Sequence, residues 1–367
     1  MRRREFLIGL GALLGTPGLA RAAPARTTLA AAWQAGDRNQ VGILDQDSAR
    51  GLQIAGALDV PTRAHGLLRE RDGALLAVAR RPGDWLLRWN RSGRAIAWRW
   101  IEPRRAFSGH VLVSADGRTL YTTETDLDTG AGLIGVRDAA SLEKHAEWST
   151  HGIDAHELVR DAADEDHLLV ANGGIPTRPE TGRAKRDLDH MDSSLVRLDG
   201  ATGELVGEWR LTDRRLSLRH LAWSGKGPGA ILGIALQAEH DDAEARASAP
   251  VLATFDGRSL QVASAPVQLA GYGGDITASG GLFAVSCTRA QGVAFYGADG
   301  VWRGFAPLPD ACALLDSTGE IWAGGRGAAL SWGAGRHLPD VAGGPIRHSM
   351  PDFRLDNHWI ALGDAAG

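Results

Sequence analysis

One short phrase recurs along the chain, and it limits the possible folds more strongly than any other feature. In each copy a small or polar residue precedes histidine, and an alternating apolar run follows. The clear copies are Ala64-His65-Gly66-Leu67, Gly109-His110-Val111-Leu112, Ala155-His156-Glu157-Leu158, Arg219-His220-Leu221-Ala222 and Asn357-His358-Trp359-Ile360. Degenerate copies are Gly274-Asp275-Ile276-Thr277 and Ala311-Cys312-Ala313-Leu314. The intervals between successive copies are 45, 46, 64, 55, 37 and 46 residues. A four-stranded propeller blade takes about 40–50 residues, so the repeat predicts an all-β, seven-bladed β-propeller.

The sequence between the phrases supports strands rather than helices. Apolar runs such as Leu75–Ala79 and Trp85–Trp89 follow turns such as Asp72-Gly73, and they alternate with a period of two. Glycine is abundant, at 48 residues, as expected for a chain with many turns. The alternative is a β-sandwich in which the repeats are accidental, but seven phrases in one register favour the propeller.

The two ends of the chain together predict the seventh blade. The phrase at His358 supplies one strand before the chain ends. Near the other end, Leu29–Trp33, Val41–Leu44 and Leu52–Leu58 form a second, third and fourth strand that lack a first. A blade shared between the ends closes the ring and removes an open sheet edge.

The N-terminus has the pattern of an export signal. Arg3, Arg4, Phe6 and Leu7 match a twin-arginine core, and an apolar run and Ala20-Arg21-Ala22 follow. We therefore expect a signal peptide over residues 1–22, a single propeller domain over residues 23–367 and a periplasmic location. The alternative is a basic, apolar tail without this role. The apolar run is too short to span a bilayer as a mature helix.

Charge and cysteine content exclude several classes of protein. The net charge is −4 with both signs interspersed, which gives no footprint for nucleic acid. Only Cys287 and Cys312 are present, too few for a disulfide scaffold, and the sequence leaves their redox state open. There is no phosphate-binding glycine loop, Gly-x-Ser-x-Gly, His-Glu-x-x-His or haem-attachment motif. We expect a monomer with no transmembrane segment in the mature chain.

Equivalent residues on the inner strands of a propeller form a ring around its axis. Near one mouth of the channel this ring should consist of His65, His110, His156, His220, Asp275, Cys312 and His358. Imidazole and thiolate suit Fe, Cu or Zn, so the five histidines and Cys312 are the candidate metal ligands. Seven residues are too many for one ion, but neighbours such as His65, His110 and His156 with His358 could converge. The alternative is that these histidines only tie neighbouring blades together.

Polar residues beside the ring are candidates for contacting a cofactor or an anion. They come from the phrases and from loops at the same mouth: Arg80, Arg81, Glu124, Glu157, Asn172 and Arg219. Each also has a structural interpretation. Glu157 could face the next blade, Asn172 could end a strand, and Cys312 could be a small buried hydrophobe.

Several stretches resemble a known family of bacterial proteins. They include Arg80-Arg81-Pro82-Gly83, Tyr121-Thr122-Thr123-Glu124, His156-Glu157-Leu158, Asn172-Gly173-Gly174-Ile175 and Asp356-Asn357-His358. The chain resembles uncharacterised, twin-arginine-exported propellers that are often encoded beside imelysin-like proteins in iron-regulated gene clusters. This resemblance implies a periplasmic setting and a link to iron, but no reaction. Asp275 departs from the family, in which a small polar residue stands at this position. A more distant likeness to YVTN and quinoprotein propellers concerns the fold alone.

Three functions remain open from the sequence. The first is a non-enzymatic periplasmic protein that binds a metal ion or metal complex at the histidines and acts with iron-uptake partners. The second is a metal- or histidine-dependent hydrolase, lyase or oxidoreductase that uses the same site. The third is an interaction scaffold with structural histidines.

Overall fold

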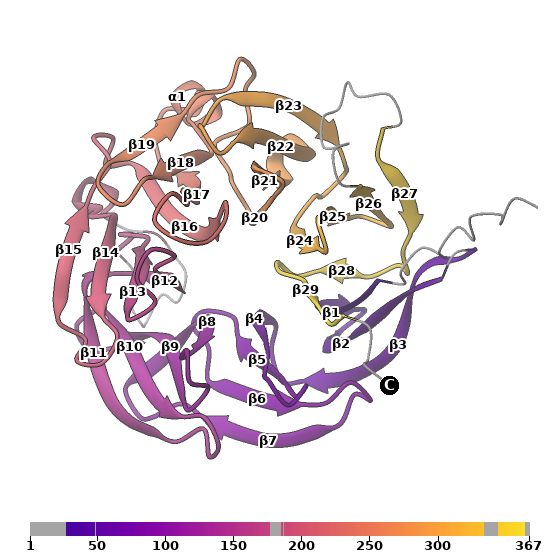
Figure 1. The fold of residues 1–367 in the computed structure, drawn as a ribbon, viewed down its shortest axis with the longest axis horizontal. Helices are drawn as coiled ribbons and strands as arrows, with labels where there is room; N and C mark the ends of the chain where they lie inside the picture. The colour runs from indigo at the N-terminus through magenta and orange to yellow at the C-terminus, as the bar shows by residue number, and fades with distance from the viewer. Residues whose placement is uncertain (1–26, 48, 177–184, 186, 334–343, 364–367) are drawn as a thin grey trace, which may run out of the picture.

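The structure is a computed structural model that describes residues 27–47, 49–176, 185, 187–333 and 344–363. The expected signal peptide over residues 1–22 lies outside the described residues. Seven antiparallel sheets surround a central axis, and their innermost strands face it (Figure 1). The predicted seven-bladed β-propeller is therefore confirmed.

Six blades are each formed by four consecutive strands, which follow one another outward from the axis. The innermost strands are β4 (Ala64–Arg69), β8 (Arg105–Val113), β12 (Ala155–Arg160), β16 (Leu216–Trp223), β20 (Ile276–Ser279) and β24 (Ala313–Ser317). The second strands are β5 (Leu75–Ala79), β9 (Thr119–Asp126), β13 (His167–Asn172), β17 (Leu232–Ala238), β21 (Leu282–Cys287) and β25 (Glu320–Gly325).

The outer half of each of these blades completes the sheet. The third strands are β6 (Trp85–Trp89), β10 (Ala131–Asp138), β14 (Ser194–Asp199), β18 (Leu252–Phe255), β22 (Gly292–Gly297) and β26 (Ala328–Trp332). The outermost strands are β7 (Ala95–Trp100), β11 (Lys144–Ile153), β15 (Leu205–Trp209), β19 (Leu260–Ala263), β23 (Trp302–Pro307) and β27 (Ile346–Ser349).

The seventh blade joins the two ends of the chain, as the sequence predicts. Its second, third and outermost strands are β1 (Thr28–Ala35), β2 (Arg38–Asp47) and β3 (Gly51–Val60). Two short C-terminal pieces, β28 (Arg354–Leu355) and β29 (Ile360–Ala361), both pair with β1 and form the innermost strand. β29 also contacts β4 and β24, the inner strands of the two adjacent blades, so the ring is closed by sheet pairing and by packing.

In the residues that the structure describes, helical structure is confined to connections between strands. These segments are the helix α1 (Ala243–Ser248) and the 3-10 turns η2 (Leu188–His190) and η3 (Thr288–Ala290). No helix in the described part of the chain is long and apolar enough to cross a membrane.

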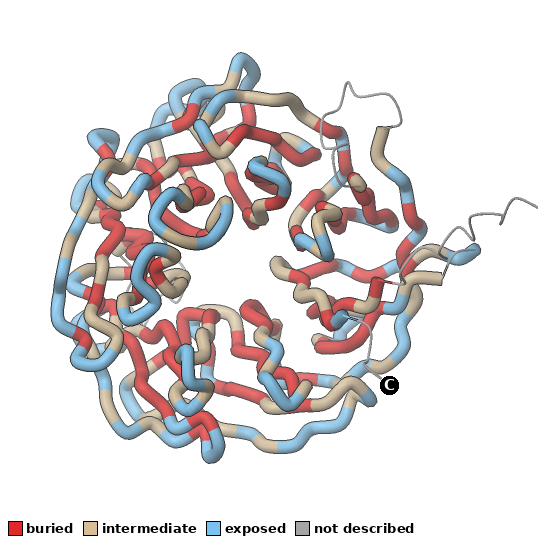
Figure 2. The backbone as a smooth tube through the Cα atoms, viewed as in Figure 1, coloured by how far each residue is buried: buried red, intermediate tan, exposed pale blue. Residues whose placement is uncertain are grey.

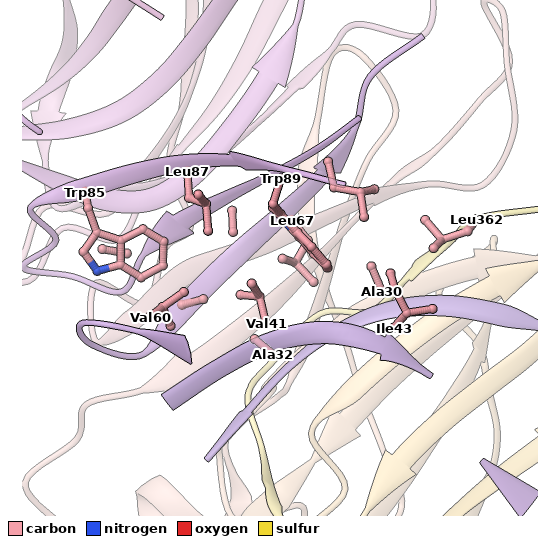
Figure 3. Packing of buried hydrophobic residues seen from close by; sticks show 14 residues of the cluster. Ala30, Ala32, Val41, Ile43, Val60, Leu67, Trp85, Leu87, Trp89 and Leu362 are labelled. Carbon is pink, nitrogen blue, oxygen red and sulfur yellow. The ribbon is translucent and has the colours of Figure 1, made fainter. Parts of the chain in front are cut away.

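Burial follows the strands rather than one central core. Inner and middle strands are mostly buried, whereas the outermost strands expose alternate residues (Figure 2). Between the seventh blade and the blade of β4, the fully buried Trp85 and Trp89 pack with Val41, Leu87 and Leu362 (Figure 3). Such interfaces fix the angle between neighbouring blades, and thereby place their inner strands around one axis.

Candidate functional site

The ring histidines all lie at irregularities in their inner strands. Four of the inner strands contain a bulge, at which the inner strand has one or two more residues than the second strand with which it pairs. The interruptions fall between Ala64 and Leu67 in β4, Phe107 and Val111 in β8, Ala155 and Leu158 in β12, and Leu218 and Leu221 in β16. A bulge of this kind turns a side chain away from the direction that regular pleating would give it.

His358 is displaced from its sheet in the same way. It lies between β28 and β29, where the chain leaves the pairing with β1, and it has a left-handed backbone with a φ of 69°. By contrast, β20 and β24, which follow Asp275 and Cys312, pair regularly with their neighbours. The five blades that carry histidine therefore differ locally from the two that do not.

These irregularities bring the five imidazoles together at the axis. The ring centroids are 4.4 Å apart for His220 and His358 and 5.7 Å apart for His65 and His156. Nε2 of His220 lies 2.9 Å from Nε2 of His156 and 3.3 Å from Nε2 of His65. Residues far apart in the sequence thus form one cluster, named here the histidine cluster: the buried His65, His110 and His220 and the half-buried His156 and His358.

Four members of the histidine cluster have the geometry closest to a metal site. One ring nitrogen from each of His65, His110, His220 and His358 lies within 4.8 Å of the others. Two ring nitrogens that each lie about 2.1 Å from one ion are at most about 4.2 Å from each other. Small shifts of the four side chains towards the axis would therefore bring all four nitrogens to a single ion. These four histidines include His220, whereas the sequence suggested His156 as the fourth ligand.

The contacts of His156 explain why it is not one of the four candidate ligands. The guanidinium of Arg219 donates to its Nδ1 at 3.4 Å. In the neutral ring Nε2 then carries the hydrogen, which points at Nε2 of His220. The nitrogen of His156 that faces the cluster is therefore a donor rather than a free ligand.

Four buried ring nitrogens of the histidine cluster lack a hydrogen-bond partner among the described residues. They are Nδ1 of His65, Nε2 of His110, Nδ1 of His220 and Nε2 of His358. Leaving a buried polar atom unsatisfied costs about 1–3 kcal/mol. The cluster therefore has unused bonding capacity that a ligand at the axis would satisfy.

Two carboxylates stand behind two of these imidazoles. Oδ1 of Asp275 lies 3.0 Å from Nδ1 of His358, and Oε1 of Glu157 lies 3.5 Å from Nδ1 of His110. Both arrangements leave Nε2 directed away from the carboxylate. Metal-binding histidines are commonly oriented by a carboxylate at the second ring nitrogen. Asp275, a ring member in the sequence, thus lies behind the imidazoles.

Burial keeps most of the histidine cluster neutral. It lowers the pKa values of His65, His110, His156 and His220 well below the usual value, and nearby charged groups lower them further. Burial also acts to lower the pKa of His358, but Asp275 outweighs it and the pKa of His358 is raised. Burial raises the pKa of Glu157 to about 7. Neutral imidazole is the form that binds metals.

Two buried aspartates each bridge a pair of arginines beside the histidine cluster. Asp356 pairs with Arg63 and lies 3.7 Å from Arg80. Asp154 pairs with Arg81, and it lies 3.0 Å from Arg219. These two Arg–Asp–Arg triads hold Arg80, Arg81 and Arg219 beside the histidine cluster. The sequence suggested these three arginines as contacts for a cofactor or an anion.

The remaining predicted site residues do not join the histidine cluster. The thiol of Cys312 lies 3.7 Å from the backbone oxygen of Asp356, and burial raises its pKa to about 12. Glu124 is buried between Arg137, at 2.7 Å, and Lys144, at 2.9 Å. Asn172 donates to the hydroxyl of Ser194 in its own blade and to the backbone oxygen of Thr150 in the preceding blade, so it links the two blades. Cys287 and Cys312 are both free thiols.

Pockets lie on two sides of the histidine cluster. One of about 330 Å³ is bordered by His110, Glu157, Asp275 and His358 and by residues farther along the inner strands. The other, of about 780 Å³, is bordered by residues that precede inner strands, namely Arg63, Cys312 and Asn357, and by Arg80, which follows β5. The smaller pocket therefore reaches the histidine cluster itself, whereas the larger pocket is bordered by Asn357, the sequence neighbour of His358.

Asp154, Asp356 and Arg63 were missed as site residues from the sequence. Each stands two positions before a ring histidine: Arg63 before His65, Asp154 before His156, and Asp356 before His358. A charged residue two positions before a ring histidine is a repeated sequence pattern that could have indicated these residues. Their ion-pair partners come from other blades, so the sequence does not identify the partners.

Comparison with protein families gives one match. The model described as "Protein of unknown function (DUF1513)" matches residues 58–362, which is most of the chain. No curated protein matches the chain.

Solved structures show that the fold is shared with distant propellers. A hypothetical selenium-binding protein from Sulfolobus tokodaii has a TM-score of 0.67 at 13% identity, covering 95% of this chain and 96% of that one. Virginiamycin B lyase from Staphylococcus aureus has a TM-score of 0.55 at 10% identity, covering 78% of this chain and 84% of that one. At such identities the likeness concerns the fold alone.

Proposed function

The chain belongs to the family of proteins of unknown function DUF1513, and we propose that its histidine cluster binds one transition-metal ion on the propeller axis. His65, His110, His220 and His358 would supply the ligands. His156 would remain beside them as a donor held by Arg219.

The unpartnered ring nitrogens carry this proposal. Contacts between blades, the structural alternative, account for only one nitrogen of each of these four imidazoles. The second nitrogens, Nδ1 of His65 and of His220 and Nε2 of His110 and of His358, are buried without a hydrogen-bond partner among the described residues. Carboxylates behind His110 and His358 orient their free nitrogens, as expected for ligands.

The chemistry of the donors restricts the metal. Neutral imidazoles suit Zn, Cu, Fe or Ni, whereas Mg and Ca prefer oxygen ligands. Asp275 partly offsets the positive charge that an ion would bring into this buried site. We infer that the occupant is Fe, Cu or Zn.

Metal-dependent stabilisation tests the proposal. Binding to the folded state alone stabilises a protein by about 2.7 kcal/mol when the free ion is at 100 times its Kd. Melting of the wild type should therefore shift upward with Zn²⁺, Cu²⁺ or Fe²⁺, and the shift should vanish in His65→Ala/His110→Ala. Exposed His145 and His151 supply the control variant His145→Ala/His151→Ala, which should shift like the wild type. An unchanged melting temperature for the wild type with all three ions would refute the metal site.

We further propose that the protein is exported to the periplasm and acts there with iron-uptake partners. Support comes from the Arg3-Arg4 signal pattern and from the resemblance to propellers of iron-regulated gene clusters. Arg3→Lys/Arg4→Lys should leave the protein in the cytoplasmic fraction. Export unaffected by this change would contradict the twin-arginine route.

The smaller pocket favours a second candidate, a metal-dependent enzyme. It touches His110 and His358 and also holds Glu157, so a small substrate could reach an ion from this side. Turnover that requires both the ion and the pocket would distinguish an enzyme from a binding protein.

A further inference from the structure

We propose that the larger pocket binds a polyvalent oxyanion, with carboxylate or phosphate groups, directly beside the histidine cluster. Its position relative to a bound ion rests on the proposed function, but the anion site itself does not require the metal. Four arginines border the pocket: Arg63, Arg80, Arg326 and Arg354.

The charge of the lining supports an anionic ligand. The acidic residues among the described residues that border the pocket are Asp310 and Asp352, and Asp310 pairs with Arg326. Beneath them, the buried carboxylate of Asp356 is shared by Arg63 and Arg80, so this triad carries a net charge of +1. The whole chain has a net charge of −4, so this cationic mouth is a local feature.

The second triad extends the positive region towards the axis. Asp154 is fully buried and is shared by Arg81 and Arg219, which again gives a net charge of +1. Arg219 is only 3% exposed, and burial lowers its pKa to about 10. Nearby Glu239 offsets some of this charge, but Lys185 pairs with it.

The position of these arginines bears on the form in which a metal would arrive. Arg80 and Arg219 are close enough to the histidine cluster to lower the pKa values of His65 and of His156. The same positive charges would repel a bare cation. A metal that arrives together with an anionic ligand avoids this repulsion, since the anion lies against the guanidiniums.

Size and geometry favour a polyatomic anion over chloride. The pocket has a volume of about 780 Å³, within the range of sites for small organic ligands. Guanidinium groups bind carboxylate and phosphate oxygens through paired hydrogen bonds. The structure does not choose between these two oxyanions, so both serve as probes.

Calorimetric titration of metal-free protein with citrate and with pyrophosphate tests the proposal. In a buffer free of other polyvalent anions, we expect one site per chain for at least one probe, weakened by added NaCl. Arg63→Gln should weaken binding about ten- to hundredfold, as expected for a lost charged hydrogen bond. Arg354→Gln, on an exposed lining residue, should weaken binding without threatening the fold. The control is Arg104→Gln, since Arg104 lies outside the pocket lining and pairs with Asp128.

The outcomes separate this inference from the metal site. His65→Ala/His110→Ala should bind the anion as the wild type does while losing the metal. Absence of binding for both probes, or equal binding by wild type, Arg63→Gln and Arg354→Gln, would overturn the anion site whatever the metal titration shows. A bound anion in a protein that takes up no metal would instead leave this inference standing and remove the metal centre.

Discussion

Asp275 and His358 lie on either side of Cys312 in the inner ring, and they meet only because the C-terminal strand closes the propeller. Oδ1 of Asp275 lies 3.0 Å from Nδ1 of His358, and its Oδ2 accepts the backbone N–H of Leu314 at 2.8 Å. One buried carboxylate therefore joins three blades and fixes the orientation of one imidazole. Metal affinity and ring closure are linked through this contact.

Asp275→Asn should weaken metal binding by about ten- to hundredfold, the usual effect of losing a carboxylate behind a metal-binding histidine. Asparagine keeps the size of the side chain but not its charge, so Nδ1 of His358 loses its acidic partner. Competition titration against a chelator measures the change. The control is Asp316→Asn, on the exposed part of β24. Wild-type affinity in Asp275→Asn would show that the carboxylate does not orient a ligand.

Gly109→Ala tests whether the bulge in β8 positions the imidazoles. Gly109 has a φ of 112°, and a Cβ there would lie 2.7 Å from Cδ2 of His65. Gly73 has a φ of 89° and open space around it, so Gly73→Ala adds backbone strain without this contact. We expect both variants to be destabilised, but only Gly109→Ala to lose metal affinity, measured by the same titration. Equal affinities would show that the close approach of Gly109 to His65 is unimportant.

Trp359→Ala should destabilise the protein by about 3–5 kcal/mol, as is typical for removing a buried tryptophan. Trp359 is 3% exposed and packs with Trp33 and Trp322 between the seventh blade and the blade of β24. Urea unfolding measures the change. Trp100, 55% exposed on β7, provides the control variant Trp100→Ala, which should change stability little. Similar effects for the two variants would contradict a closing role for Trp359.

Acid should remove one electrostatic contribution to stability at the outer edge of the blade of β8. Glu147 pairs with Arg105 and Lys144, and the hydrogen bond from Arg105 is the largest cause that lowers its pKa from 4.5 to about 2. Asp126 and Glu102 face the same cations. Because the folded-state pKa is depressed, this contribution is complete above about pH 4.5 and disappears as the pH falls to about 2.

Glu147→Gln should therefore be less stable than the wild type at pH 7, and the difference should shrink between about pH 4.5 and 2. Urea unfolding at several pH values measures it. The control is Glu143→Gln, whose carboxylate is exposed and pairs with Arg99. A difference that stays constant down to pH 2 would contradict the assigned ion pairs.

The fold could be predicted because each blade repeats the same local pattern. Strand β5 and β6 have the predicted bounds, Leu75–Ala79 and Trp85–Trp89, since period-two alternation and the turns around them are local properties. The shared blade could also be predicted from the sequence. The N-terminal segment provides three strands without a first strand, and the C-terminal segment provides a single strand, so together they make one blade of four strands.

The site could be predicted only in outline. Equivalent positions in a repeat indicated that the histidines face one axis, but the set of four contains His220 rather than His156 because Arg219, from the next blade, contacts His156. The partners of Asp154 and Asp356 come from other blades, so no local pattern reveals the triads. Glu124 looked like a site residue because its polar neighbours in sequence resemble a loop, whereas Arg137 buries it in the sheet.

Anomalous diffraction from crystals grown with Zn²⁺ or Cu²⁺ tests the central claim most directly. The account predicts one strong peak on the propeller axis, about 2.0–2.1 Å from ring nitrogens of His65, His110, His220 and His358. Saturated crystals with no peak among these four imidazoles, or with metal bound only at surface sites, would contradict it.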